Sequence, residues 1–104
     1  MIYQKRPHSE YKLVEITSNT LYKLYEELGQ SYSQVYLSNG FLILRDKYGD
    51  SSIDELNIVV NVDGENIPIF GTFFLLKVGK EKILDMNQHD LSLFKELFIS
   101  SVED

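Results

Sequence analysis

Two stretches of the chain repeat apolar residues at the spacing of one helix face. The first covers residues 19–28, where apolar side chains recur at i, i+3, i+4 and i+7 before Gly29 (Leu21, Leu24, Tyr25 and Leu28). The second covers residues 87–99, where Asn87 is a good N-cap and Asp90 favours the positive end of the helix dipole. Both stretches therefore predict amphipathic helices that pack on other elements.

The rest of the apolar pattern predicts strands. These cover residues 11–16, 34–37, 41–45, 57–62, 67–70 and 72–78. Asn39-Gly40 stands between two of them and indicates a type I′ hairpin turn, and Asp63-Gly64 predicts a second turn. Gly71 indicates a bulge or a close backbone approach. Residues 73–76 are apolar without alternation, which is typical of a central strand covered on both faces.

These elements predict an α+β fold. We expect a two-layer domain in which two helices pack against a mainly antiparallel sheet of four or five strands. Residues 1–104 are predicted to form a single small domain, because a chain of this length normally builds one hydrophobic core. Residues 46–55 are polar and rich in turn formers, so they predict a loop.

Composition and charge narrow the classes of function. The formal net charge of −6 argues against direct binding of nucleic acid and permits an acidic surface offered to a basic partner, although simple solubility explains it equally well. The chain has no cysteine, which excludes disulfides and thiolate chemistry. No window approaches the roughly 20 apolar residues of a membrane span, and the amino terminus lacks a signal-peptide pattern. We therefore expect no membrane contact and a cytoplasmic location.

Catalytic and metal-binding patterns are not found in the sequence. Three carboxylate pairs fall in predicted loops or on a polar helix face, where they are expected to be solvated (Asp54-Glu55, Glu26-Glu27 and Asp63/Glu65). His8 and His89 have no metal-like spacing, and no glycine-rich phosphate loop occurs. The prediction is a protein without catalytic residues, metal site or cofactor.

Seven residues are candidates for binding. Tyr32, Tyr36 and Tyr48 can line a pocket or an interface, since tyrosine offers an apolar ring and a hydroxyl, although half-exposed sheet positions explain them equally well. Asp63 and Glu65 flank the acidic turn. Arg45 and Lys77 belong to a basic set with Lys47, Lys80 and Lys82, which would hold a phosphorylated ligand if the strand ends meet. Ordinary solvated charge accounts for this set equally simply.

Four short pieces of the chain carry a family resemblance. They are residues 32–37, Asp63-Gly64 with Ile69, Gly71-Thr72-Phe73-Phe74, and Leu93-Phe94 with Leu97-Phe98. In these pieces the chain resembles a small uncharacterised family found on phages, plasmids and conjugative elements. That family often has an Asn-Arg pair before the acidic turn, where this chain has Asn61-Val62, so no role of that arginine is transferred. The family has no assigned catalytic residues.

The resemblance implies an accessory protein of a mobile element. The leading prediction is a non-enzymatic protein that binds and modulates a host protein and counters host defence. The alternative is an oligomeric sponge that sequesters a nucleotide-type signalling molecule between the tyrosines and the Arg45/Lys77 region. Residues 57–62, if they form an edge strand, predict pairing with a second copy of the chain.

Overall fold

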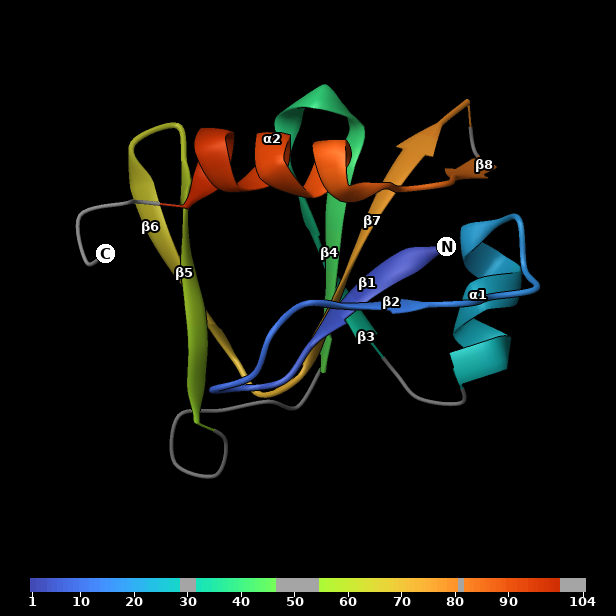
Figure 1. Ribbon diagram of the computed structural model, residues 1–104, viewed down its shortest axis with the longest axis horizontal. Coiled ribbons are helices and arrows are strands. Elements are labelled where there is room, and N and C mark those ends of the chain that lie inside the picture. Colours follow the sequence, from blue (N-terminus) through green and yellow to red (C-terminus); the bar gives the residue numbers. More distant parts are fainter. Residues whose placement is uncertain (29–31, 47–54, 81, 100–104) are drawn as a thin grey trace.

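An antiparallel sheet of six strands forms the middle of the structure (Figure 1). The computed structural model describes residues 1–28, 32–46, 55–80 and 82–99. Within these ranges the elements are β1 (Ile2–Lys5), β2 (Lys12–Val14), α1 (Leu21–Leu28), β3 (Tyr32–Tyr36), a 3₁₀ turn (Ser38–Gly40), β4 (Phe41–Asp46), β5 (Leu56–Val62), β6 (Glu65–Phe70), β7 (Phe73–Gly79), β8 (Lys82–Leu84) and α2 (Gln88–Phe98). The large sheet has the order β2-β1-β7-β4-β3, and β8 pairs with the end of β7. Strands β5 and β6 form a separate two-stranded sheet.

Strand β7 lies in the centre of the large sheet, as its unbroken apolar run predicted. It pairs with β1 on one side and with β4 on the other, and residues 73–76 are all buried. Residues 41–44 of β4 are buried in the same way. Because successive side chains of a strand point to opposite faces, these two strands present apolar surface on both faces of the sheet. Both faces therefore need a cover.

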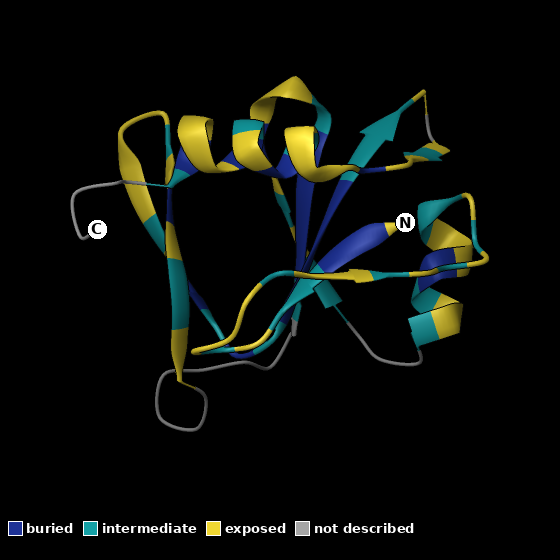
Figure 2. Cartoon of the chain, viewed as in Figure 1, coloured by how far each residue is buried: buried dark blue, intermediate teal, exposed yellow. Residues whose placement is uncertain are grey.

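The two helices supply these covers on opposite faces. On one face, Phe73 belongs to a core cluster with Phe94 of α2 and Val60 of β5. On the other face, Phe74 belongs to a second cluster with Leu24 of α1. The α+β class, with a mainly antiparallel sheet and two helices, is confirmed. The predicted two layers become three because β4 and β7 are apolar on both faces, and Figure 2 shows these buried strands between the helices.

The strand count also differs from the prediction of four or five in one sheet. Strands β1 and β8 were not predicted, since each is short. In β1 the adjacent residues Ile2 and Tyr3 are both buried, so buried and exposed positions do not alternate. Residues 57–62 and 67–70 form strands as predicted, but they pair with each other and not with the large sheet. Pairing between distant segments decided the place of β1, which pairs with β7, whereas β5–β6 and β7–β8 pair as local hairpins.

Short-range signals placed the Asn39-Gly40 turn and the start of α2 correctly. Asn39 (φ 62°, ψ 23°) and Gly40 (φ 81°) have the left-handed conformations of a type I′ turn, and the Phe41 amide donates to the Ser38 carbonyl. At α2, the Asn87 side chain accepts from the Asp90 amide at 2.9 Å, and the Asp90 carboxylate accepts from the Asn87 amide at 3.0 Å. This capping box confirms the predicted helix start, whereas α1 begins two residues later than predicted.

Asn57 connects the two sheets. Its amide nitrogen donates to the carbonyls of Lys5 (2.9 Å) and Gly71 (2.7 Å), and its amide oxygen accepts from Lys5 Nζ at 2.7 Å. The Gly71 amide in turn donates to the Glu55 carbonyl at 2.8 Å. Gly71 has φ 74° in the tight link between β6 and β7, and this conformation accounts for a glycine at that position. One side chain thus holds β1, β5 and this link together.

Replacing Asn57 should therefore destabilise the fold. We expect Asn57→Ala to lower the free energy of unfolding by about 2 kcal/mol, because it leaves three partly buried polar groups without their partner. Asn61→Ala is the matched control, since Asn61 is exposed and its side chain bonds across the hairpin to Asn66. Urea unfolding of both variants measures the difference. Equal midpoints for the two variants would contradict the role of Asn57.

Candidate functional site

Arg45 and Lys77, which were predicted to share a basic spot, lie at opposite ends of the β4–β7 pair. Arg45 is paired with Phe73 at the start of β7, whereas Lys77 is paired with Phe41 at the start of β4. Four residues separate the two positions along each strand, which corresponds to about 13 Å. The predicted joint site is therefore wrong. Antiparallel pairing brings the end of one strand to the start of the other.

Both side chains make contacts that join elements of the fold. Arg45 donates from Nε to Ser33 Oγ at 3.3 Å and from Nη1 to the Pro68 carbonyl at 3.3 Å. It therefore ties the large sheet to β6. The Nζ of Lys77 lies 3.2 Å from Oδ1 of Asp90, which ties β7 to α2. Neither Arg45 nor Lys77 lines either of the two grooves described next.

The three candidate tyrosines lie in different environments. Tyr32 is half-buried, and its ring meets the Phe74 ring edge-on with centroids 5.7 Å apart. Tyr36 is at the other end of β3 and is 61% exposed. Tyr48 lies outside the described residues. Of the two described tyrosines, Tyr36 is the one available at the surface.

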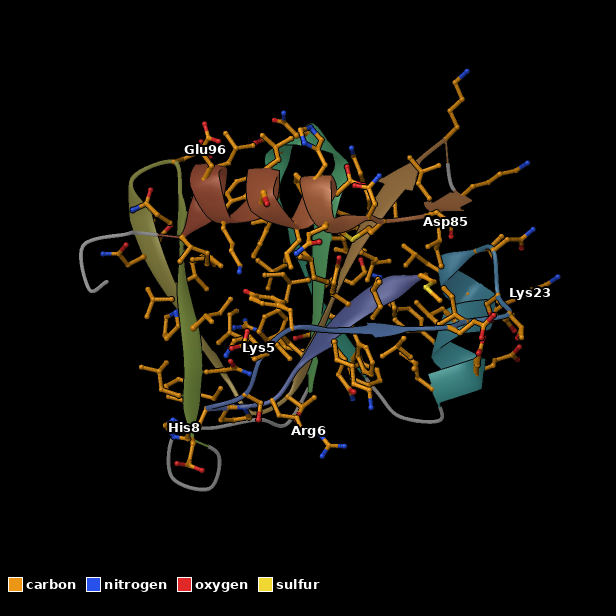
Figure 3. The ribbon with its side chains drawn as sticks, in the orientation of Figure 1. Lys5, Arg6, His8, Lys23, Asp85 and Glu96 are labelled. Atoms are coloured by element: carbon orange, nitrogen blue, oxygen red, sulfur yellow. The ribbon has the colours of Figure 1, made fainter. Side chains whose placement is uncertain are left out.

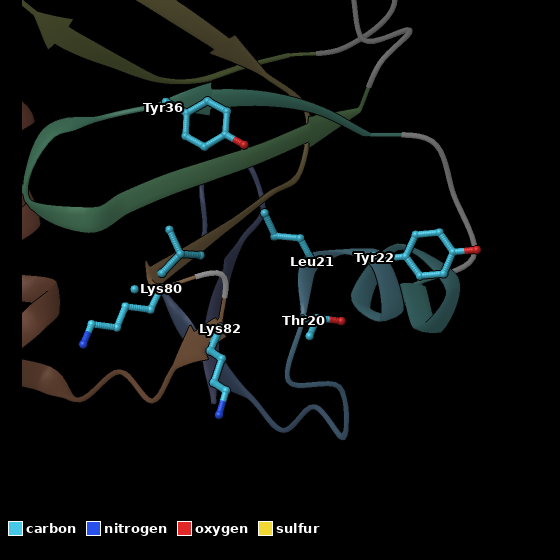
Figure 4. A pocket seen from close by; sticks show the side chains of 8 residues that line it. Thr20, Leu21, Tyr22, Tyr36, Lys80 and Lys82 are labelled. Carbon is cyan, nitrogen blue, oxygen red and sulfur yellow. The ribbon is translucent and has the colours of Figure 1, made fainter.

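A shallow groove of about 780 Å³ opens beside Tyr36 (Figure 4). This tyrosine groove lies between the start of α1, the end of β3 and the β7–β8 connection, and it is lined by Thr20, Leu21, Tyr22, Tyr36, Val78, Gly79, Lys80 and Lys82. Lys80 and Lys82 belong to the basic set predicted from the sequence, whereas Tyr22, which is 74% exposed, was not predicted. The sequence signal for an exposed Tyr22 was its position outside the apolar stripe of α1, because a ring at that position faces away from the sheet.

A second hollow of about 530 Å³ follows β5. This β5 groove is lined by Leu56, Asn57, Ile58, Val59, Asn61, Asn66 and Ile99. A single bridge joins Ile99 to Val60, so the residue after α2 lies against the outer edge of β5. Leu56 and Val59 are 48% and 38% exposed. The groove therefore combines apolar side chains with amide groups that can form hydrogen bonds.

Acidic side chains gather at one end of the β5 groove. Asp63 in the β5–β6 turn and Glu65 at the start of β6 are exposed. The last turn of α2, which carries exposed Glu96, lies at the same end of the molecule (Figure 3). Within the described residues, these three carboxylates have no cation partner. Lys95, next to Glu96, lies over the Tyr11 ring at 5.0 Å from its centroid. We call Asp63, Glu65 and Glu96 the acidic end.

The described residues show neither a metal centre nor a membrane span. Across residues 1–28, 32–46, 55–80 and 82–99, no three histidine, aspartate or glutamate side chains form a group suited to a metal ion. In the same ranges, neither helix combines the length and the apolar character needed to cross a bilayer. His8 pairs instead with Glu55, with Nε2 and Oε2 2.9 Å apart.

Comparisons with protein families, with curated proteins and with solved structures found no match to this chain. The resemblance to a mobile-element family therefore stays a prediction. A functional proposal must be supported by the two grooves and the charges around them.

Asp90 links the predicted site residue Lys77 to the stability of the fold. Its side chain is 14% exposed, and this burial acts to raise the pKa of the carboxyl group. Hydrogen bonds from the Asn87 amide and from Lys77 Nζ outweigh burial and hold the pKa below its ordinary value of 3.8. The folded state therefore binds the Asp90 proton less readily than the unfolded state does.

This pKa shift predicts a pH dependence of stability. The Asp90 contribution is fully present above pH 3.8 and is lost as the pH falls through the lower pKa of the folded state. We expect Asp90→Asn to lower the free energy of unfolding at neutral pH by about 1–2 kcal/mol and to flatten its decline in acid. Urea unfolding from neutral to acidic pH measures both effects. Asp63→Asn is the control, and a matching change in that variant would contradict the assignment.

Proposed function

We propose that this protein acts by binding a basic partner protein through the β5 groove and the acidic end. The observation that supports this best is the combination of exposed Leu56 and Val59 with unpaired carboxylates, among the described residues, at the end of the same groove. Protein interfaces commonly have an apolar centre and a polar rim. The acidic end would then provide the rim, and β5 would provide the centre.

The negative charge of this interface favours a basic partner. An overall charge of −6 together with an acidic end attracts a basic surface over a distance of about one Debye length, roughly 8–10 Å at physiological salt. Rim charges of this kind mainly raise the association rate, while buried apolar contacts slow dissociation. The amide groups of Asn61 and Asn66, which bond to each other at 3.0 Å, lie between these two regions and add polar contacts.

The setting of this activity follows from the resemblance described above. We place the protein as a non-enzymatic accessory protein of a phage or another mobile element, which binds a host protein in the host cytoplasm and counters host defence. The acidic surface would compete with nucleic acid for a basic site on that host protein. The inferred chemistry of the partner rests on the β5 groove and the acidic end, whereas the inferred biological setting rests on the resemblance.

Removing charge from the acidic end tests the proposal. We expect Asp63→Asn/Glu65→Gln to reduce capture of a basic partner from a bacterial lysate at low salt by roughly tenfold, because the electrostatic attraction is lost. Glu15→Gln/Glu26→Gln is the matched control, since both residues are exposed and lie outside the groove and the acidic end. Quantitative mass spectrometry of the captured proteins measures the effect. Equal losses of partner capture in both double variants would show that only the net charge matters and would contradict the proposal.

A second copy of the chain is the competing occupant of the β5 groove. Light scattering decides between the two, because the proposal expects a monomer that Val59→Glu leaves unchanged while partner capture is lost. A dimer that dissociates in Val59→Glu would assign the groove to self-association. That result would overturn the proposal of a basic partner.

A further inference from the structure

Helix α1 covers only part of one face of the large sheet. Helix α1 has eight residues, and its Tyr25 hydroxyl accepts a hydrogen bond from Gln34 in the middle of β3. Tyr36, two residues further along β3, points to the same face but is 61% exposed. The tyrosine groove is therefore the part of this face that the short helix does not reach.

The groove has the size and the surface of a small-ligand site. Its volume of about 780 Å³ falls within the range of roughly 300–1,000 Å³ that is typical of ligand pockets. Leu21 and Val78 are half-buried and form its floor, and Figure 4 shows Leu21 pointing towards the Tyr36 ring. An exposed tyrosine ring next to an apolar floor offers a flat surface on which a planar ring can stack.

Two lysines provide the charge. Lys80 and Lys82 are exposed, and within the described residues neither forms an ion pair. Figure 4 shows both ammonium groups directed outwards from the same side of the groove. Because a lysine side chain is a flexible four-carbon stem, both groups can turn to an anion bound at this edge. Glu81 stands between the two lysines in the sequence, so residues 80–82 have a formal charge of +1 on a chain whose net charge is −6.

The wall beside these lysines is held in place by the backbone. An added Cβ at Gly40, which has φ 81°, would lie 2.9 Å from the Val78 carbonyl oxygen. The β3–β4 turn therefore packs directly against the end of β7, and only glycine fits at this contact. This packing fixes the distance between the strand that carries Tyr36 and the strand that leads to Lys80.

We propose that the tyrosine groove binds a nucleoside monophosphate, with its base stacked on Tyr36 and its phosphate held by Lys80 and Lys82. A nucleoside monophosphate combines a planar ring with an anionic group at this size. The groove lies on the α1 face of the sheet, whereas the β5 groove lies on the α2 side. This site is therefore independent of the proposed partner interface.

The test uses NMR titration of the labelled full chain with AMP, GMP and UMP, with adenosine and inorganic phosphate as partial ligands. Amide shifts should appear at the tyrosine groove, and the monophosphates should bind more tightly than either partial ligand. We expect Tyr36→Ala to weaken AMP binding about tenfold, since stacking on one ring is removed, whereas Tyr36→Phe keeps the ring and the affinity. Equal affinities for AMP and inorganic phosphate would overturn the proposal.

The lysines are tested with a charge-matched pair. Lys80→Gln/Lys82→Gln should weaken AMP binding about tenfold and leave adenosine binding unchanged, because only the phosphate contact is lost. Lys12→Gln/Lys23→Gln removes two exposed lysines outside the groove and should leave AMP binding unchanged. Equal weakening in both double variants would overturn the proposal, as would a lack of saturable AMP binding at millimolar concentration.

Two further measurements distinguish the tyrosine groove from a nucleic-acid site and from the partner interface. A short oligoadenylate that binds much more tightly than AMP would assign the groove to single-stranded nucleic acid and overturn the proposal. Asp63→Asn/Glu65→Gln, which tests the partner interface, should leave AMP affinity unchanged. Failure of the AMP titration and failure of partner capture are thus distinguishable. The thermal midpoint of each variant without ligand confirms that the compared proteins are folded.

Discussion

The fold depends on one constraint, which is that the apolar β4–β7 pair must be covered on both faces. Residues 41–44 and 73–76 are buried, and each buried aliphatic or aromatic side chain contributes roughly 1.5–3 kcal/mol that exposure would forfeit. A single helix shields one face of a sheet. The helices α1 and α2 therefore lie on opposite faces, and the β5–β6 hairpin extends the cover on the α2 side.

The two covers are unequal, and the candidate sites arise from this inequality. On the α1 side, Tyr36 and Val78 border an open groove beside the start of the helix. On the other side, the hairpin contributes Val60 to the core and leaves its neighbour Val59 38% exposed. The surface features that suit binding are thus the places where the covering layers stop.

Charged side chains divide into those that hold the fold together and those that remain at the surface. Lys5, Arg45 and Lys77 each join separate elements through hydrogen bonds. Lys80 and Lys82 have no ion-pair partner within the described residues and lie beside the β7–β8 connection, whereas the acidic end lies at the β5–β6 turn on the opposite side of the view (Figure 1). The exposed lysines of the tyrosine groove and the acidic end therefore lie on different sides of the molecule.

The sequence by itself determined both helices, the Asn39-Gly40 turn, the capping box at Asn87 and the central position of β7. These features depend on the spacing of neighbouring residues, which the linear pattern contains. Only the tertiary structure decided that β1 joins the large sheet, that the helices take opposite faces and that Arg45 and Lys77 lie apart. Each of these depends on which distant segments pair and in which direction. When two strands pair antiparallel, residues near the carboxyl ends of the two strands lie far apart. The spacing of residues along the chain does not reveal which strands pair in this way.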